Sequence, residues 1–190
     1  YRVGEAGEAP FEPVLQTAEA LGAPVIRVWA GRRGSAEADA ACRRRVAADA
    51  RRIAALAAEA GLRVAFEFHA NTLTDTNESA AALLAELAET SVGSYWQAPV
   101  GAPAEYCLAG LRAVGERLVH VHAFTWHRQS RARLPLADGE ADWRRYLAAA
   151  AAVPGEHFVM LEFVADDDPA AFRRDAATLK SWVSALPAAP

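Results

Sequence analysis

The sequence contains only two cysteines, Cys42 and Cys107, and neither belongs to a CxxC pair or to a Cys/His arrangement with zinc-ligand spacing. Neither a disulfide framework nor a structural zinc site follows from two such residues. Both cysteines fall in segments with a helical pattern. We therefore expect them to be buried or chemically indifferent thiols.

The sequence also lacks long hydrophobic runs and an excess of positive charge. No apolar run approaches the ~20 residues that a membrane-spanning helix needs, and no signal peptide is recognisable. The formal net charge is −4, which argues against a nucleic-acid partner because phosphate binding needs a basic face. Arginines cluster between positions 43 and 52, but an alanine-rich helical pattern with acidic residues there predicts a solvated helix face. We expect a cytoplasmic protein that binds neither nucleic acid nor membranes.

What the sequence does contain is enough apolar material for a core. It has 190 residues, of which 53% are hydrophobic and 23% are charged. This composition is that of an ordinary globular protein, and the length suits one domain better than two. We therefore predict a single domain over residues 1–190.

Short apolar segments alternate with helical patterns along the chain. Five segments predict strands: 24–29, 63–69, 92–97, 118–124 and 158–164. Helices are expected at 11–21, 36–60, 75–88, 104–117, 142–154 and 169–186. Gly22 is expected to end the first, Ser35 to cap the second, and Asp75 with Glu78 to form a capping box at the start of the third. Asp168-Pro169 is expected to start the last. The opening residues 1–13 and the stretch 126–139 are expected to be irregular, and a loop as long as the second is usually functional.

This alternation predicts an α/β fold with parallel strands and right-handed crossovers. A complete (βα)8 TIM barrel takes ~250 residues, or roughly 31 per unit. Five units and a leading helix account for the present chain, so we expect an incomplete TIM-barrel type that lacks the first three strands. Uncovered strand edges would then favour association as a homo-oligomer. A short flavodoxin-like sheet is the alternative.

Residues able to bind a metal or transfer a proton recur near the ends of these strands. Glu67, Gln97, His122 and Glu162 lie on four different strands, and the carboxyl ends of barrel strands meet at one face. Two carboxylates, an amide and an imidazole suit Mn²⁺, Mg²⁺ or Co²⁺. An ion there can polarise a carbonyl and stabilise an enediolate while a carboxylate moves a proton. An unpaired carboxylate is costly to bury, which favours function over structure for both glutamates.

A second group of residues is expected to contact a substrate. Tryptophans at strand exits can stack on a sugar ring or simply fill the barrel mouth, and the histidines share the faces of predicted ligands but can also be merely hydrogen-bonded. A loop arginine can hold an anionic or hydroxyl group or be an ordinary surface charge. The candidates are Trp29, His69, Trp96, His120, Trp126 and Arg133.

Several motifs together resemble the xylose isomerase-like barrel superfamily, within it the sugar phosphate isomerase/epimerase group. They are Ala65-Phe66-Glu67-Phe68-His69, Val119-His120-Val121-His122, Arg133-Leu134-Pro135 with Gly139 and Trp143, and Val159-Met160-Leu161-Glu162-Phe163. The resemblance extends from Pro24 onward and aligns the chain with strands four to eight. It implies that Glu67, Gln97, His122 and Glu162 bind one divalent ion, that the glutamates form the acid/base pair, and that Arg133 orients the substrate.

The sequence departs from that family pattern at two positions. The family has an aspartate where this chain has Gln97, and the epimerases have a histidine where it has Val100. The first change removes a negative charge from the metal site, and together they put an ordinary ketose 3-epimerase activity in doubt.

Three functions are therefore compatible with the sequence. The first is a metal-dependent isomerase or epimerase of a sugar or sugar derivative. The second is a dehydratase, which would use the same metal and base, and which product analysis separates from the first. The third is a non-catalytic, sugar-binding or degenerate barrel that has lost its metal through Gln97, which metal analysis would reveal.

Overall fold

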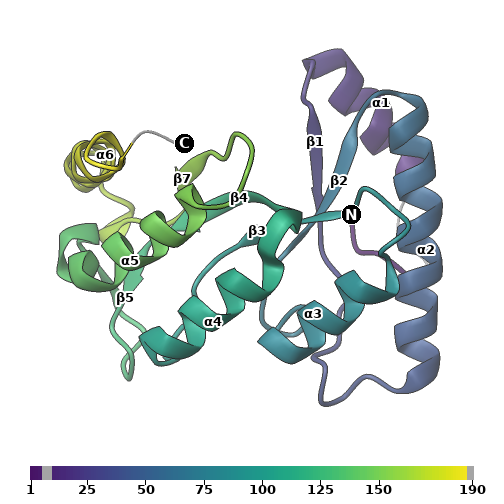
Figure 1. Ribbon diagram of the computed structural model, residues 1–190, viewed down its shortest axis with the longest axis horizontal. Coiled ribbons are helices and arrows are strands. Elements are labelled where there is room, and N and C mark those ends of the chain that lie inside the picture. The colour runs from purple at the N-terminus through teal and green to yellow at the C-terminus, as the bar shows by residue number, and fades with distance from the viewer. Residues whose placement is uncertain (6–9, 188–190) are drawn as a thin grey trace. The chain divides into compact units, whose positions relative to one another are not determined.

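The computed structural model describes residues 1–5 and 10–187, which form two compact units, Tyr1–Tyr95 and Trp96–Pro190. Strands and helices alternate along the chain, and the strands of each unit's sheet pair in parallel (Figure 1). The predicted α/β alternation and parallel pairing are confirmed. That all 190 residues form one domain stays a prediction.

The first unit is built from three parallel strands and three helices. In it β1 pairs with β2 and β2 with β3, so that Val28 lies opposite Phe66 and Glu67 opposite Tyr95. The strands are β1 (Val25–Val28), β2 (Arg63–Glu67) and β3 (Gly93–Trp96), and the helices are α1 (Phe11–Leu21), α2 (Ala40–Glu59) and α3 (Asn77–Glu86). The last residue of β3 already belongs to the second unit. The C-terminal end of β2 is what positions Glu67.

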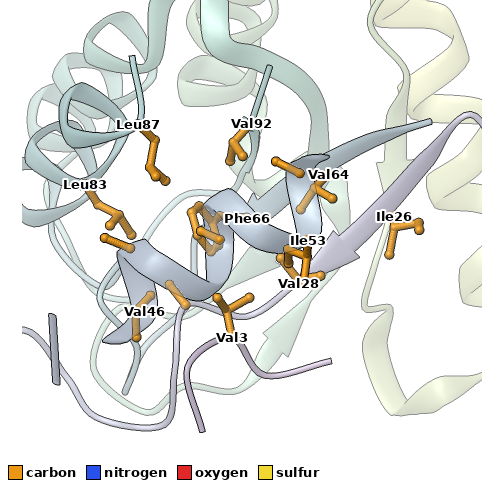
Figure 2. Close-up of a cluster of buried hydrophobic side chains, with 14 of the residues drawn as sticks. Val3, Ile26, Val28, Val46, Ile53, Val64, Phe66, Leu83, Leu87 and Val92 are labelled. Carbon is orange, nitrogen blue, oxygen red and sulfur yellow. The ribbon is translucent and has the colours of Figure 1, made fainter. Parts of the chain in front are cut away.

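A cluster of buried aliphatic and aromatic side chains holds the first unit together (Figure 2). Helix α2 supplies Val46 and Ile53, which lie with Val64 and Phe66 of β2. Fully burying a side chain of this size contributes about 1.5–3 kcal/mol. Residues 64–67 are all buried, so β2 is covered on both faces, as parallel strands usually are.

Two helix starts differ from the sequence-based expectation. Helix α2 is capped by Asp39, whose carboxylate accepts a hydrogen bond from the Cys42 N–H at 2.6 Å, and not by Ser35. The Ser35 N–H instead donates to Asp75 Oδ2 at 3.0 Å. Helix α3 is capped by Thr76, one residue after the expected Asp75. The Asp75 carboxylate is thus bound to the loop that precedes α2. The caps are provided by Asp39 for α2 and by Thr76 for α3.

The Asp39 cap predicts a pH-dependent contribution to stability. The hydrogen bond from the Cys42 N–H lowers the pKa of Asp39 below its ordinary value of 3.8. A lowered folded-state pKa means that the stabilisation is present above the unfolded pKa and disappears as the pH falls through the folded one. We expect Asp39→Asn to unfold at lower urea than the wild type at pH 7, with the difference disappearing as the pH falls below the ordinary Asp pKa of 3.8 and through the lowered folded-state pKa. A difference that stays constant from pH 7 to pH 2 would contradict this account.

The second unit pairs β4 (Leu118–Ala123) with β7 (Val159–Leu161) in parallel, with Val121 opposite Val159 and His122 opposite Met160. All six residues of β4 are buried. The helices of this unit are α4 (Ala104–Val114), η1 (Gly115–Arg117), α5 (Glu140–Ala151), η3 (Ala165–Asp167) and α6 (Pro169–Ser184). The predicted start of α6 is confirmed, because Asp168 accepts a hydrogen bond from the Ala171 N–H at 2.8 Å and proline follows it.

The stretch expected to be an irregular loop contains a small hairpin. Strands β5 (Thr125–Trp126) and β6 (Arg133–Leu134) pair antiparallel, and the short helix η2 (Leu136–Gly139) follows. The His127 N–H donates to the Ala132 carbonyl at 2.8 Å, which continues the pairing toward the turn. Two-residue strands carry too little hydrophobic alternation to be recognised in sequence.

Of the opening residues expected to be irregular, residues 1–3 pair with Trp29, directly after β1, and residues 6–9 lie outside the described residues. Arg2 forms a parallel bridge with Trp29, and the Val3 N–H donates to the Trp29 carbonyl at 2.9 Å. Val3 is fully buried in the core of the first unit. The opening segment therefore extends the pairing of β1 on its free side.

The two cysteines lie where the sequence placed them. Cys42 in α2 and Cys107 in α4 are both buried and free. Within the described part of the chain, no helix has both the length and the apolar character that crossing a bilayer requires.

Candidate metal and substrate site

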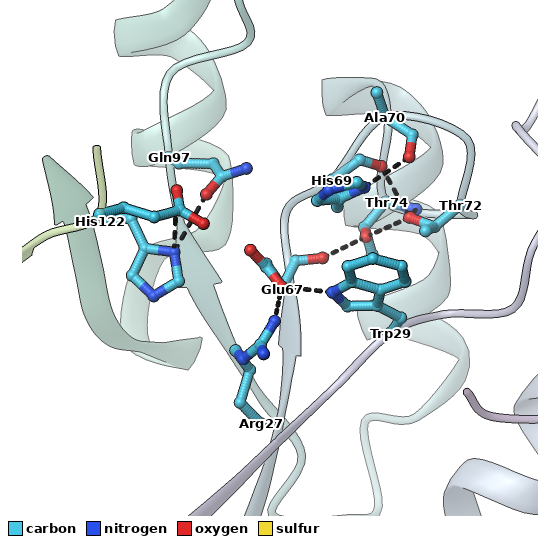
Figure 3. A network of polar contacts seen from close by, with 10 residues as sticks. Arg27, Trp29, Glu67, His69, Ala70, Thr72, Thr74, Gln97 and His122 are labelled. Carbon is cyan, nitrogen blue, oxygen red and sulfur yellow. Dashed lines mark hydrogen bonds and ion pairs between the residues drawn. The ribbon is translucent and has the colours of Figure 1, made fainter. Parts of the chain in front are cut away.

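Glu67 is the last residue of β2, and its side chain is buried, with 1% exposed. Arg27 Nη1 and Trp29 Nε1 both donate to its Oε2 atom (Figure 3). Its backbone carbonyl accepts a hydrogen bond from Thr74 Oγ1 at 2.6 Å. An ionised carboxylate can be buried only when it is paired and hydrogen-bonded, and these contacts meet that requirement.

Arg27 is a site residue that sequence reasoning missed. It lies two positions before Trp29 at the end of β1, and residues at that spacing point to the same face of a strand. Both side chains therefore reach the same carboxylate oxygen. The available signal was a lone arginine in the otherwise apolar segment Val25–Val28.

Removing Arg27 should destabilise the first unit. Arg27→Met leaves the Glu67 carboxylate without its charged donor, and we expect the free energy of unfolding to fall by about 1–3 kcal/mol. The lower part of that range is expected because 46% of the Arg27 side chain is exposed and water can replace part of the contact. Urea unfolding measures the change, with Arg44→Met on the exposed face of α2 as the control. Equal stability of the two variants would contradict the pairing.

Aromatic contacts surround Trp29. The His69 ring stacks on it with centroids 4.3 Å apart, and the Arg2 guanidinium lies over it at 4.7 Å from the ring centroid. His69 Nδ1 also hydrogen-bonds the Ala70 carbonyl at 2.6 Å, which fixes that ring. Trp29 and His69, both predicted to contact substrate, thus lie together next to the Glu67 carboxylate.

In the second unit, His122 brings together two of the other predicted ligands. Its Nδ1 atom lies 3.0 Å from Gln97 Oε1 and 3.5 Å from Glu162 Oε2 (Figure 3). His122 comes from β4, and Gln97 follows directly after β3. Glu162 follows β7, and its N–H donates to the Ala123 carbonyl at 3.3 Å. Parallel pairing of β4 with β7 is what places the imidazole and this carboxylate side by side.

The Glu162 Oε2 atom is buried and has no hydrogen-bond partner among the residues that the structure describes. A buried carboxylate oxygen without such a partner is costly, and a bound cation would remove that cost. The donor set of an amide oxygen, an imidazole nitrogen and a carboxylate oxygen is one that Mg²⁺, Mn²⁺ or Co²⁺ accepts. The residues present therefore fit a divalent ion.

Two further candidates lie within the core. Trp96 is fully buried, and its ring packs edge-to-face on Tyr146 with centroids 5.3 Å apart. His120 is also buried, and its Nδ1 accepts a hydrogen bond from the Phe158 N–H at 3.0 Å. That bond makes Nδ1 the unprotonated nitrogen of the neutral ring.

The remaining two candidates face each other across the hairpin. Trp126 on β5 pairs with Arg133 on β6, and both contact Phe163. The Arg133 guanidinium lies 4.9 Å from the Phe163 ring centroid and forms an ion pair with Asp167. Phe163 immediately follows Glu162, so the hairpin of β5 and β6 packs beside the segment that carries Glu162.

Burial also affects a tyrosine opposite Glu67. Tyr95 is the register partner of Glu67 on β3, and its removal from water raises the pKa of its phenol, which the nearby Arg27 charge partly offsets. The hydroxyl therefore stays protonated at neutral pH and remains a hydrogen-bond donor. Sequence reasoning did not single out this residue.

Parallel strands that end in carboxylate, amide and imidazole side chains are typical of an α/β protein of the TIM-barrel type. The family model described as "xylose isomerase-like TIM barrel" matches residues 9–182, and the chain belongs to this family. The predicted family and fold class are thereby confirmed. Among curated proteins, a search finds no sequence that matches this chain.

Solved structures with the same fold include a probable dehydratase, a xylose isomerase-like protein and an epimerase-like protein. A probable 3-DHS dehydratase, AsbF, from Bacillus anthracis is 20% identical with a TM-score of 0.74, over 95% of this chain and 74% of that one. A xylose isomerase-like TIM barrel protein from Mycobacterium smegmatis, in complex with magnesium, is 16% identical with a TM-score of 0.69, over 92% and 66%. A D-tagatose 3-epimerase-like protein is 18% identical with a TM-score of 0.67, over 90% and 66%. The chain thus spans about two thirds to three quarters of these proteins.

Proposed function

We propose that this chain belongs to a divalent-metal-dependent isomerase or epimerase that acts on a small sugar or sugar derivative. The observation that carries the proposal is the group around His122. Its Nδ1 atom faces an amide oxygen at 3.0 Å and a carboxylate oxygen at 3.5 Å. That carboxylate oxygen, Glu162 Oε2, is buried and lacks a hydrogen-bond partner within the described residues.

Glu67 is proposed as the fourth ligand, beside Gln97, His122 and Glu162. In TIM barrels the C-terminal ends of the strands surround one mouth, where the active site lies. Glu67 is the last residue of β2, and Glu162 follows β7 directly. The ion is Mn²⁺, Mg²⁺ or Co²⁺, and the magnesium complex of the Mycobacterium smegmatis structure supports this choice.

The two glutamates are proposed as the acid/base pair. When bound, the ion supplies polarisation of a substrate carbonyl. One glutamate, ionised, removes a proton from the adjacent carbon to give an enediolate, and the other glutamate, protonated beforehand, returns a proton to that carbon. Arg27 and Trp29 orient Glu67 by donating to its Oε2 atom. Two differently held carboxylates thus serve two different proton transfers.

Of the six residues predicted to contact the substrate, four are proposed to do so directly and two to support the site. Trp29 and His69 lie next to Glu67, and Trp126 and Arg133 flank Phe163 beside Glu162, so these four are assigned to direct contact. The other two, Trp96 and His120, are assigned to supporting the site from the core, because both side chains are buried and held by neighbours.

Proton exchange with solvent tests the proposed function. The purified protein is incubated with Mn²⁺ in D₂O and a panel of ketoses that includes D-fructose, D-tagatose, their phosphates and keto sugar acids, and NMR follows deuterium at the carbon beside the carbonyl. We expect metal-dependent deuterium incorporation that chelation with EDTA abolishes. Incorporation that is identical with and without metal would contradict the proposal, as would none with any ketose of the panel.

A dehydratase is the second candidate function. It is favoured by the probable 3-DHS dehydratase, whose fold matches 95% of this chain with a TM-score of 0.74. Removal of the same proton followed by loss of hydroxide would use the same groups. Incubation with 3-DHS distinguishes the two, because a dehydratase forms a product smaller by one water, which mass spectrometry detects.

A further inference from the structure

The first unit carries a cavity in which one arginine, Arg2, has no part in the proposed chemistry. The cavity is about 220 Å³ and is lined by Tyr1, Arg2, Arg27, Val28 and Trp29. A water molecule takes ~30 Å³ in the liquid, so the space admits a group of several heavy atoms. Two of its five lining residues are arginines, and it adjoins Glu67 through Arg27 and Trp29.

Arg2 presents an uncompensated charge in this cavity. Its guanidinium lies over the Trp29 ring at 4.7 Å and has no carboxylate partner among the described residues. A guanidinium held over an aromatic ring keeps its N–H groups in its own plane, where they can bind two oxygens at once. The stacking therefore orients the donors without using them.

Arg27 adds a second guanidinium with donors to spare. One of its five N–H groups donates to Glu67, and 46% of its side chain is exposed. Two other carboxylates of this unit already have partners: Asp49 pairs with Arg52 at 2.9 Å and accepts the Tyr1 hydroxyl at 2.9 Å, and Glu5 accepts the Arg32 N–H at 3.0 Å. The described residues that line the cavity thus include two arginines and no carboxylate, and Glu67 is the one described carboxylate that pairs with either arginine.

We infer that this cavity binds an anionic group, a carboxylate or a phosphate, of the small-molecule substrate. Planar guanidinium groups match both anions, which fixes the shared chemistry as an oxyanion with at least two accessible oxygens. The inference rests on the proposed function only in making the ligand a substrate. It narrows the substrate class to a sugar acid or a sugar phosphate, bound with its charged end beside Glu67.

Calorimetric titration of metal-free protein tests the cavity independently of catalysis. The probes are inorganic phosphate, D-gluconate as a carboxylate, and sorbitol as an uncharged polyol. We expect saturable binding of at least one anion and none of sorbitol, and the tighter of the two anions identifies the group. Arg2→Gln should weaken anion binding roughly tenfold, since it removes one charge-assisted contact and 1.4 kcal/mol is a factor of ten. Arg2→Lys should bind the anion with an affinity between those of the wild type and Arg2→Gln, because it keeps the positive charge but loses the planar guanidinium.

The control is Arg44→Gln, which removes the same charge from the exposed face of α2 and should bind as the wild type does. Equal affinity of Arg2→Gln and the wild type would overturn the inference, and so would sorbitol binding as tightly as the anions. A separate Mn²⁺ titration distinguishes the two proposals. Arg2-dependent anion binding without Mn²⁺ binding would leave the cavity assignment standing while removing the metal-dependent function.

Discussion

Glu162→Gln is expected to lower kcat by about 10²- to 10⁴-fold, the usual contribution of a positioned acid or base. The substitution keeps the volume of the side chain but removes the group that takes up the proton. Glu162 Oε2 is buried, lies 3.5 Å from His122 Nδ1 and has no hydrogen bond in the described structure. Steady-state kinetics with the substrate found by deuterium exchange measures the effect.

Glu156→Gln serves as the matched control for this prediction. Glu156 is an exposed residue of the same unit, in the segment before β7, and its substitution should leave kcat within twofold of the wild type. Circular dichroism and urea unfolding should show both variants folded. Undiminished turnover by Glu162→Gln would remove this residue from the proposed acid/base pair.

Gln97→Asp is expected to bind Mn²⁺ at least about tenfold more tightly than the wild type, a change of ~1.4 kcal/mol. Gln97 Oε1 lies 3.0 Å from His122 Nδ1, so an aspartate there would add a negative charge beside the proposed ligands. A single added charge at a partly buried position is worth this much or more. Isothermal titration with Mn²⁺ measures the change.

Gln129→Asp provides the same added charge at an exposed position of the loop between β5 and β6. We expect it to leave Mn²⁺ affinity within twofold of the wild type, because water and salt screen an exposed charge. Unchanged or weaker Mn²⁺ binding by Gln97→Asp would mean that the residue at position 97 does not face the ion.

Elements with strong local signals were predictable from the sequence. Gly22 ends α1 with a positive φ of 62°, and the Asp168-Pro169 pair starts α6, as expected. The apolar segments around 63–67 and 118–123 form buried strands, as their length and hydrophobicity predicted. These features depend on residues close together in the sequence, so they can be predicted from the sequence without the tertiary structure.

Features that depend on distant partners were not predictable. Ser35 does not cap α2, which begins only at Ala40, and the Ser35 N–H instead donates to Asp75, a residue 40 positions away. The hairpin of β5 and β6 was missed because its strands have two residues each. Arg27 was overlooked because its role depends on Glu67, which only the pairing of β1 with β2 brings into reach. In each case the deciding contact is set by tertiary structure.

For the candidate site, the sequence pointed to individual residues but not to the contacts that those residues make. The resemblance to the family pointed to Gln97, His122 and Glu162, and these three lie within contact distance around one imidazole nitrogen. The resemblance did not indicate that the Trp29 ring contacts His69 and Arg2, or that Glu67 accepts hydrogen bonds from two donors. Those contacts depend on side-chain packing that no motif encodes.

The central claim is that Glu67, Gln97, His122 and Glu162 bind one divalent ion together. The most direct measurement is anomalous diffraction from a crystal grown with Mn²⁺. The account predicts one strong peak per chain, with oxygen or nitrogen atoms of all four side chains about 2.0–2.3 Å from it. A peak bound by His122 and Glu162 but not by Glu67, or no peak at saturating Mn²⁺, would contradict it.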